Sequence, residues 1–289
     1  MRLEGKTALI TGAGSGIGRA LAVEAAGHGM AVALVGRRRE PLQETRTLMG
    51  EDASALLHTA DITAPDARRG LVQRVAAEWG RVDFLVNNAG LLLAGPVSGA
   101  SDRDIDRLLA TNVAAPLAMA REFLPLLLAA DEGRIVNVGS MLGDIPMPLF
   151  AAYCGSKFAL RGLSTALRRE LEGLGIRVTY AAPRAVRTEA AADIGEYLDP
   201  FAMTFDTPGR VARQIWRAAA RGRKTVYPGR RERLFCRLEQ LVPSVIDRSL
   251  RSQLQAYLGR KTSGGYGTRS QSSANPKPVA FEPALKCRD

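Results

Sequence analysis

Cysteine and histidine are scarce in this chain of 289 residues, which contains three of the first and two of the second. Cys154, Cys236 and Cys287 form neither a C-x-x-C pair nor a metal-ligand spacing, which argues against a disulfide framework and favours a reducing cytoplasm. His28 and His58 are isolated in the sequence, so we interpret both as structural and expect no metal site.

Long apolar runs are absent as well. A helix needs about 18 or more consecutive apolar residues to cross a bilayer, and the sequence contains no such stretch. Residues 1–6 lead directly into a strand-like segment, so the start of the sequence does not have the apolar core of a signal peptide. We therefore expect a cytoplasmic protein.

Acidic residues are outnumbered, 29 against 40 Lys and Arg, which gives a formal net charge of +11. Residues 1–220 are nearly neutral, with 25 basic and 24 acidic residues, whereas residues 221–261 hold 11 and 3. Within that segment, residues 230–258 place apolar side chains near helical spacing, interrupted by Pro243. We predict a basic amphipathic helical extension over 229–261 that lies on an anionic membrane, covers a substrate pocket, packs on another subunit or has a solvated polar face.

The basic residues are not accompanied by an aromatic stacking pattern or a nucleic-acid reading motif, so we expect no nucleic-acid partner. Residues 262–289 are rich in Ser, Gly, Pro and Lys, a composition that predicts a disordered tail. Residues 1–228 alternate strand-like and helical runs and predict one α/β domain built on a doubly wound parallel sheet with helices on both faces. The strand-like runs lie near residues 7, 31, 55, 82, 134, 176 and 224.

A glycine-rich turn follows the first strand-like run, Thr7–Thr11. The sequence TGAGSGIG at residues 11–18 leads into an amphipathic stretch. Glycines at such a turn allow the backbone to approach a phosphate closely and direct the N-terminus of the following helix at the anion. The spacing departs from G-x-G-x-x-G, so this segment predicts a dinucleotide site only together with its strand and helix.

Tyr153 and Lys157 form a second motif, far along the chain. On a helix, residues four apart share one face, so the Lys157 ammonium lies close to the Tyr153 phenol. A nearby cation favours the phenolate, and lowering a tyrosine pKa from ~10 to ~7 takes roughly 4 kcal/mol. We expect Lys157 and a positively charged nicotinamide ring to supply this together, which would allow Tyr153 to exchange a proton with a carbonyl or an alcohol.

In these motifs and their order, the chain resembles the short-chain dehydrogenase/reductase family, in its short single-domain or classical branch. The resemblance covers about residues 5–190 and implies an NAD(P)-dependent oxidoreductase acting on CH-OH or carbonyl groups. It also implies a Rossmann-type sheet of about seven strands in the order 3-2-1-4-5-6-7. The landmarks are TGAGSGIG at 11–18, Asp61 in ADIT, NNAG at 87–90, Asn112 in TNV, Ser140 after a strand, and YCGSK at 153–157.

The resemblance implies a role for each landmark. Ser140 would hydrogen-bond the substrate carbonyl, Tyr153 would move the proton, and Lys157 would lower the phenol pKa and bind the nicotinamide ribose. Asn112 would hold a water that links Lys157 to solvent, and Asp61 would meet the adenine amine. The implied cofactor residues are Thr11, Gly12, Gly14, Ser15, Gly16, Ile17, Gly18, Arg37, Arg38, Asp61, Ile62, Asn88, Ala89, Gly90, Tyr153, Lys157, Pro183, Val186 and Thr188.

The second strand-like run ends in Gly36-Arg37-Arg38-Arg39, where an NAD-binding site usually has an acid. Arginine binds a phosphate through paired donors, and a basic start opposes the dipole of the next helix unless an anion is bound. We therefore predict NADP rather than NAD, although Ser15 stands where many NADP-dependent relatives carry a second basic residue.

One position departs from the family pattern. Pro183 and Thr188 match it, but Arg184 replaces the glycine that usually follows the proline. A side chain there would crowd the nicotinamide ring, or would contact an acidic substrate or a cofactor phosphate.

The segments 141–150 and 197–205 flank the expected cleft and are rich in Met and Phe. Met141, Phe150 and Phe201, together with Ser140 and Tyr153, are our candidate substrate residues, and they suit a lipophilic ketone, aldehyde or secondary alcohol. The apolar residues also fit a lid core or a subunit interface.

We expect a homodimer or homotetramer that reduces a lipophilic carbonyl with NADPH or oxidises the corresponding alcohol. Two alternatives stay open: a catalytically impaired NADP-binding regulator, which would explain Arg184, and a membrane-associated partner protein that acts through residues 221–261.

Overall fold

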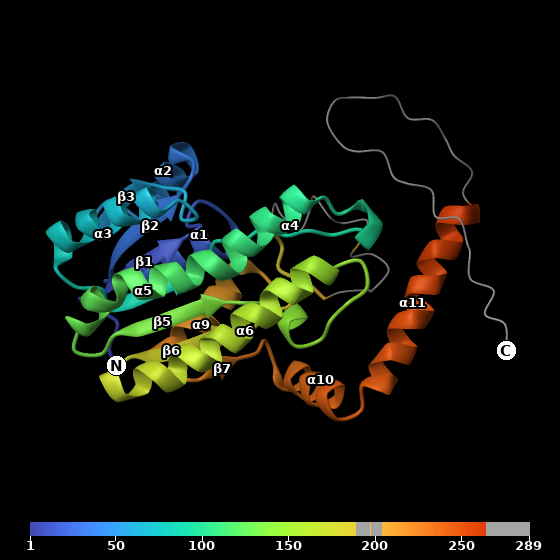
Figure 1. Ribbon diagram of the computed structural model, residues 1–289. Coiled ribbons are helices and arrows are strands. Elements are labelled where there is room, and N and C mark those ends of the chain that lie inside the picture. The colour runs from blue at the N-terminus through green and yellow to red at the C-terminus, as the bar shows by residue number, and fades with distance from the viewer. Residues whose placement is uncertain (189–196, 198–203, 264–289) are drawn as a thin grey trace.

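The computed structural model describes residues 1–188, Tyr197 and residues 204–263. A parallel sheet of seven strands crosses the molecule in the order β3-β2-β1-β4-β5-β6-β7, which confirms the predicted fold class and strand order (Figure 1). The strands are β1 (Thr7–Thr11), β2 (Ala31–Gly36), β3 (Ala55–Thr59), β4 (Phe84–Asn87), β5 (Arg134–Val138), β6 (Arg177–Ala181) and β7 (Thr225–Val226).

Helices cover both faces of the sheet (Figure 1). One apolar cluster packs α1, α2 and α9 against one face, and a second packs α3, α5 and α6 against the other. The helices are α1 (Gly16–Gly27), α2 (Arg39–Leu48), α3 (Pro65–Trp79), α4 (Asp102–Leu109), α5 (Ala115–Leu128), α6 (Ala151–Leu171), α9 (Pro208–Ala220), α10 (Arg230–Leu241) and α11 (Pro243–Ser263). Short turns η1 (Val97–Gly99), η2 (Ala110–Ala114), η3 (Met141–Gly143) and η4 (Glu172–Leu174) connect them.

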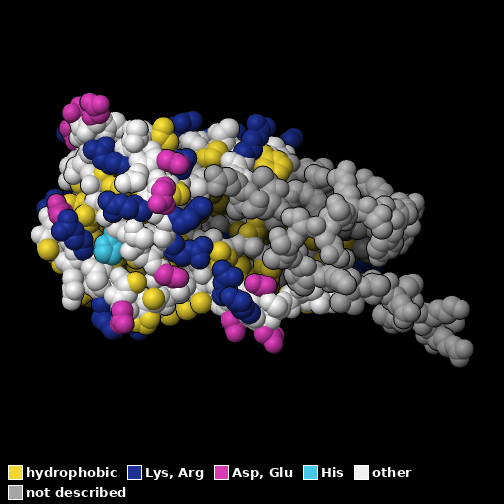
Figure 2. Space-filling view, turned by 90° about the horizontal axis from the view of Figure 1, so that it is seen from above, with side chains coloured by type: hydrophobic (Ala, Val, Ile, Leu, Met, Phe, Trp, Pro, Cys, Tyr) yellow, Lys and Arg dark blue, Asp and Glu magenta, His cyan; other side chains and the backbone are white. Residues whose placement is uncertain are grey.

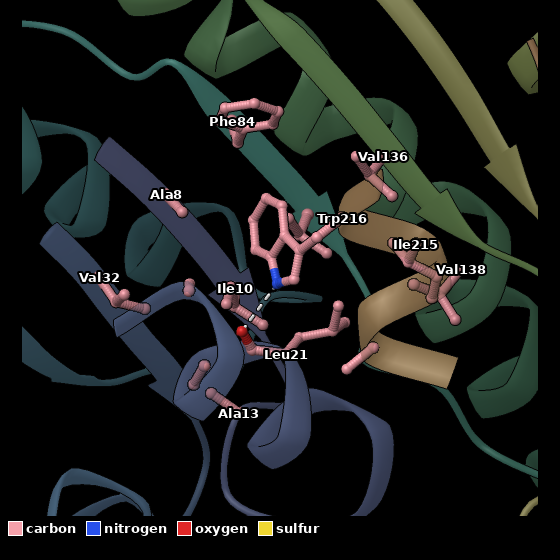
Figure 3. Packing of buried hydrophobic residues seen from close by; sticks show 14 of the residues in the cluster. Ala8, Ile10, Ala13, Leu21, Val32, Phe84, Val136, Val138, Ile215 and Trp216 are labelled. Carbon is pink, nitrogen blue, oxygen red and sulfur yellow. Dashed lines mark hydrogen bonds between the residues drawn. The ribbon is translucent and has the colours of Figure 1, made fainter. Parts of the chain in front are cut away.

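Trp216 of α9 fixes the position of that helix on the sheet. Its ring meets Phe84 of β4 edge to face, with centroids 5.2 Å apart and an interplanar angle of 82°. The indole Nε1 donates a hydrogen bond of 2.9 Å to the Leu21 carbonyl of α1, as the dashed line in Figure 3 shows. Because α9 follows the segment after β6, this contact also anchors one end of that segment.

The basic extension forms two helices, α10 and α11, because Pro243 begins a new helix at a position where its missing N–H has no consequence. The predicted helical extension over 229–261 matches these two elements closely, and residues 264–289 of the predicted tail lie outside the described part. No helix in the described part of the chain is both long and apolar enough to cross a membrane. On the face seen in Figure 2, Lys and Arg are interspersed with Asp and Glu.

Candidate active site

A cavity of about 720 Å³ lies at the edge of the sheet where the parallel strands have their carboxyl ends. The segments that follow β1, β2, β4, β5 and β6 all contribute to its walls. Ligands of doubly wound sheets bind at this edge, where the strand order reverses between β1 and β4. Most of the expected cofactor residues line the cavity: Gly12, Gly14, Ser15, Gly16, Ile17, Arg37, Arg38, Asp61, Ile62, Asn88, Ala89, Gly90, Tyr153, Lys157, Pro183, Val186 and Thr188.

The glycine turn is shaped by close contacts that leave no room for side chains. Gly12 has φ of 65°, and a Cβ atom on it would lie 2.9 Å from the Ala89 Cα. Gly16 has φ of 52°, and its Cβ would lie 2.9 Å from the Thr188 Cγ2. The turn therefore touches both the NNAG segment and the segment after β6, which encloses the space a pyrophosphate needs.

Thr11 and Gly18 belong to the expected cofactor set but do not line the cavity. The buried Thr11 hydroxyl accepts hydrogen bonds of 3.0 Å from the backbone N–H groups of both Asn88 and Ala89. The Asn88 Nδ2 donates back to the Thr11 and Gly12 carbonyls at 3.0 and 3.3 Å. A Cβ on Gly18 would collide with the Gly12 carbonyl. These residues therefore hold the ends of β1 and β4 together behind the cavity.

Ser140, Tyr153 and Lys157 meet on one wall of the same cavity. Ser140 follows β5, and the other two residues lie one turn apart on α6. The Lys157 Nζ lies 5.6 Å from the centre of the Tyr153 ring and donates a 3.1 Å hydrogen bond to the Val138 carbonyl. The phenol and the Ser140 hydroxyl are hydrogen-bonded, so two hydroxyl groups face one point of the cavity.

Burial governs the titration of this group. It raises the pKa of Tyr153 to about 12, against the smaller lowering effect of the Ser140 hydrogen bond. It also lowers the pKa of Lys157 to about 8, because a buried ammonium has lost its hydration. The sequence argument expected Lys157 and a nicotinamide ring to lower the phenol pKa together, but among the protein's own groups burial prevails. The phenol is protonated at neutral pH, the state required of a proton donor.

Asn112 lies behind the cavity wall rather than in it. It is buried in the π-helical turn η2, where its Nδ2 donates to the Leu91 carbonyl at 2.9 Å and to the Ser156 hydroxyl at 3.0 Å. Its Oδ1 accepts from the Leu91 N–H at 2.8 Å. A Cβ on Gly90 would lie 3.3 Å from that oxygen and 3.5 Å from the Lys157 Nζ. Asn112 therefore fixes the backbone beside Lys157.

Tyr180 is a functional residue that the sequence reasoning missed. Its hydroxyl donates to the Ser140 carbonyl at 3.1 Å and accepts from the Ser140 N–H at 3.4 Å. Gly139 and Gly143 make room for the ring, since a Cβ on either would overlap Tyr180. The glycines on both sides of Ser140 were the available signal, but they do not reveal which side chain fills the space.

Arg184 does not act on the cavity as a free cation. Its guanidinium donates to both carboxylate oxygens of Asp206, at 2.8 and 2.9 Å, and to the Glu232 Oε1 at 2.7 Å. These two partners raise the pKa of Arg184. The expected contact with an acidic substrate or cofactor phosphate is therefore replaced by contacts within the chain.

The basic residues after β2 have the exposure that a phosphate site needs. Arg37 and Arg38 are exposed at the cavity rim, and neither forms an ion pair with a described residue. Asp61 lies on the same rim, where hydrogen bonds from Thr63 hold its pKa below the usual value. Arg107 of α4 also lines the cavity, and the sequence reasoning did not single it out.

Apolar side chains surround the other end of the cavity. Met141, Met147 and Phe150 line it, and Phe150 also packs with Cys154 and neighbouring apolar groups. Phe201, the remaining candidate substrate residue, lies outside the described residues.

Comparisons with known proteins agree with this site. The family model described as short chain dehydrogenase matches residues 6–199. A short chain dehydrogenase of Pseudocercospora fijiensis is 37% identical over 195 residues, covering 66% of this chain and 63% of that protein. An NADPH-dependent pterin aldehyde reductase of Arabidopsis thaliana is 35% identical over 185 residues, covering 64% of this chain and 76% of that protein.

A solved structure from Burkholderia phymatum, a short chain dehydrogenase/reductase in complex with NAD, has a TM-score of 0.78. It is 25% identical, and the match covers 85% of this chain and 96% of that one. The matched family model spans the glycine turn, Ser140, Tyr153 and Lys157, which meet at a single cavity. This chain belongs to the short-chain dehydrogenase/reductase family of oxidoreductases, which act on CH-OH or carbonyl groups with NAD(P).

Proposed function

We propose that this protein reduces a lipophilic ketone or aldehyde with NADPH, or oxidises the corresponding secondary alcohol in reverse, with Tyr153 as the proton donor or acceptor. One observation carries the proposal: Ser140, Tyr153 and Lys157 lie on the wall of the cavity that the glycine turn also lines. The proposal includes a cytoplasmic location.

The reduced nicotinamide supplies a hydride to the carbonyl carbon when it is bound. Pro183, Val186 and Thr188 line the cavity beside the glycine turn and would hold that ring. The Ser140 hydroxyl and the Tyr153 phenol donate to the carbonyl oxygen, where negative charge develops. Tyr153 then gives its proton to that oxygen, and the Lys157 ammonium stabilises the phenolate that remains. Oxidation of an alcohol uses the same groups with the proton moving back to Tyr153.

The relatives do not share this substrate class by name, so the lipophilic assignment rests on Met141, Met147 and Phe150 in the cavity wall. The impaired regulator considered from the sequence is not favoured, because Arg184 pairs with Asp206 and Glu232. For the proposed homodimer or homotetramer, the exposed Leu109, Leu117 and Phe158 of α4, α5 and α6 offer an apolar contact surface.

The first prediction concerns the proton donor. Tyr153→Phe keeps the ring and its packing but removes the phenolic proton, so we expect kcat for a panel of carbonyls to fall by about 10²- to 10⁴-fold. NADPH affinity, measured by the change in its fluorescence on binding, should stay the same. Retention of most of the turnover would contradict the role of Tyr153.

The second prediction concerns pH. Lys157 is charged below its lowered pKa of about 8 and neutral above it, so stabilisation of the phenolate is lost as pH rises through that value. We expect kcat/KM for carbonyl reduction to decline above pH 8. A Lys157→Arg variant keeps its charge in this range and should not show the decline, whatever its absolute rate. An identical decline in both proteins would assign it to another group.

The third prediction concerns the choice of cofactor. Replacing Arg37 and Arg38 by alanine removes two charged donors from the rim, so we expect kcat/KM for NADPH to fall about 10- to 100-fold and that for NADH to change little. Arg39→Ala is the matched control, because Arg39 is exposed on the same segment but does not line the cavity. An unmodified enzyme that uses NADH as efficiently as NADPH would contradict the assignment.

We further infer that the extension contacts an anionic membrane surface. Five of the twelve large apolar side chains exposed among the described residues lie within residues 234–245: Leu234, Phe235, Leu241, Val242 and Val245. Five exposed arginines lie among and beyond them: Arg231, Arg233, Arg237, Arg248 and Arg251. Apolar side chains next to arginines suit the boundary between acyl chains and anionic headgroups.

The fourth prediction tests this contact. The full chain should sediment with vesicles that contain phosphatidylserine, and less with phosphatidylcholine alone or at high salt. Leu234→Glu combined with Leu241→Glu, which are 66% and 80% exposed, should abolish sedimentation. Val97→Glu, at a site 78% exposed outside the extension, is the control. Absence of sedimentation, or equal loss in the control, would contradict the inference.

A further inference from the structure

The C-terminal extension returns to the active-site cavity after leaving the sheet. Residues that follow β7 lead into α10, where the buried Cys236 and the half-buried Glu232 lie one turn apart on one face of the helix. Glu232 lines the cavity together with Arg184. A Cβ on Gly229 would lie 2.5 Å from the Glu232 Oε2, so the glycine before α10 leaves space for this carboxylate.

Arg184 joins the extension to the segment that follows β6. Its Nε and Nη2 hold Asp206, and its Nη1 holds Glu232 at 2.7 Å. Asp206 is itself tied to that segment, because its N–H donates to the Ala185 carbonyl at 2.9 Å and its carbonyl accepts from the Arg187 N–H at 3.0 Å. The planar guanidinium thus connects the segment carrying the expected nicotinamide residues to α10.

The charges at this junction balance. Asp206 has a side chain only 2% exposed and also pairs with Arg210 at 3.2 Å, so two carboxylates face two guanidinium groups. Arg184 is 23% exposed and Glu232 is 18% exposed, so water screens their contact less than it screens a fully exposed pair. A neutral residue at either position would remove the 2.7 Å contact without filling the space with another charge.

The second helix of the extension contacts the substrate end of the cavity. Leu250 of α11 packs against the apolar cluster around Phe150 and Cys154, which Met147 also joins. Phe150 and Met147 line the cavity next to Tyr153. Glu232 and Leu250 thus bring both helices to its outer side, and in Figure 1 α10 and α11 stand beyond the end of the sheet where the cavity opens.

We propose that Arg184 and Glu232 are positioning residues that fasten α10 and α11 over the substrate end of the cavity, so that the extension sets how long a lipophilic substrate binds before Tyr153. The inference deepens the proposed carbonyl reduction and rests on it. It also gives Arg184, which replaces the family's glycine, a role in this chain.

The test compares Glu232→Gln with Glu239→Gln in the full chain. Glu239 lies on the same helix, and it makes no ion pair with a described residue. The assay follows NADPH consumption over a series of 2-ketones from acetone to 2-decanone. We expect Glu232→Gln to raise KM for the long ketones several-fold while kcat, KM for acetone and KM for NADPH stay unchanged, and we expect Glu239→Gln to leave all four unchanged.

A second readout does not depend on turnover. Amide hydrogen exchange of α10 should be about three- to tenfold faster in Glu232→Gln, because the helix has lost its fastening, and unchanged in Glu239→Gln. In an Arg184→Gly background, Glu232→Gln should have no additional effect, since the partner is already gone. Failure of every ketone to react, with the exchange result as expected, would refute the proposed function but not the fastening.

Three results would overturn the inference: unchanged exchange and unchanged KM in Glu232→Gln, equal effects of Glu232→Gln and Glu239→Gln, or effects of Glu232→Gln and Arg184→Gly that simply add.

Discussion

All strands of the sheet run in the same direction, and the site depends on this constraint. Their carboxyl ends meet at one edge, so segments distant in the sequence open into one cavity. The turn after β1 supplies glycines that a backbone or a phosphate can approach. The segment after β5 supplies Ser140, and the helix that follows supplies Tyr153 and Lys157. No segment forms the site alone, and a change in strand order would separate its parts.

Burial makes the reactive groups depend on one another. It raises the pKa of Tyr153 and lowers that of Lys157, so the wall of the cavity holds a protonated phenol beside an ammonium that gives up its proton more readily than lysine normally does. Charge that develops on a substrate oxygen meets two hydroxyl donors in a setting with little water to compete. Tyr180 and Asn112 hold the backbone on either side of these groups without lining the cavity themselves.

The sequence predicted those parts of the site that depend on local pattern. Glycine spacing, strand alternation and Tyr-x-x-x-Lys each act within a few residues, and the strand order brings them together. Tyr180 and the Arg184–Glu232 pair could not be predicted, because side-chain direction decides those contacts between distant segments. Thr11 illustrates a related difficulty: it lies within the right motif, yet its hydroxyl supports the NNAG backbone from behind the cavity.

A crystal structure with bound NADP would test the central claim most directly, because that claim concerns where one dinucleotide lies relative to residues from separate strands. We expect the pyrophosphate at Gly12–Gly18, the 2′-phosphate beside Arg37 and Arg38, and the nicotinamide ring within reach of the Tyr153 phenol. A dinucleotide bound elsewhere on the protein, or bound at the glycine turn with its nicotinamide directed away from Tyr153, would contradict the account.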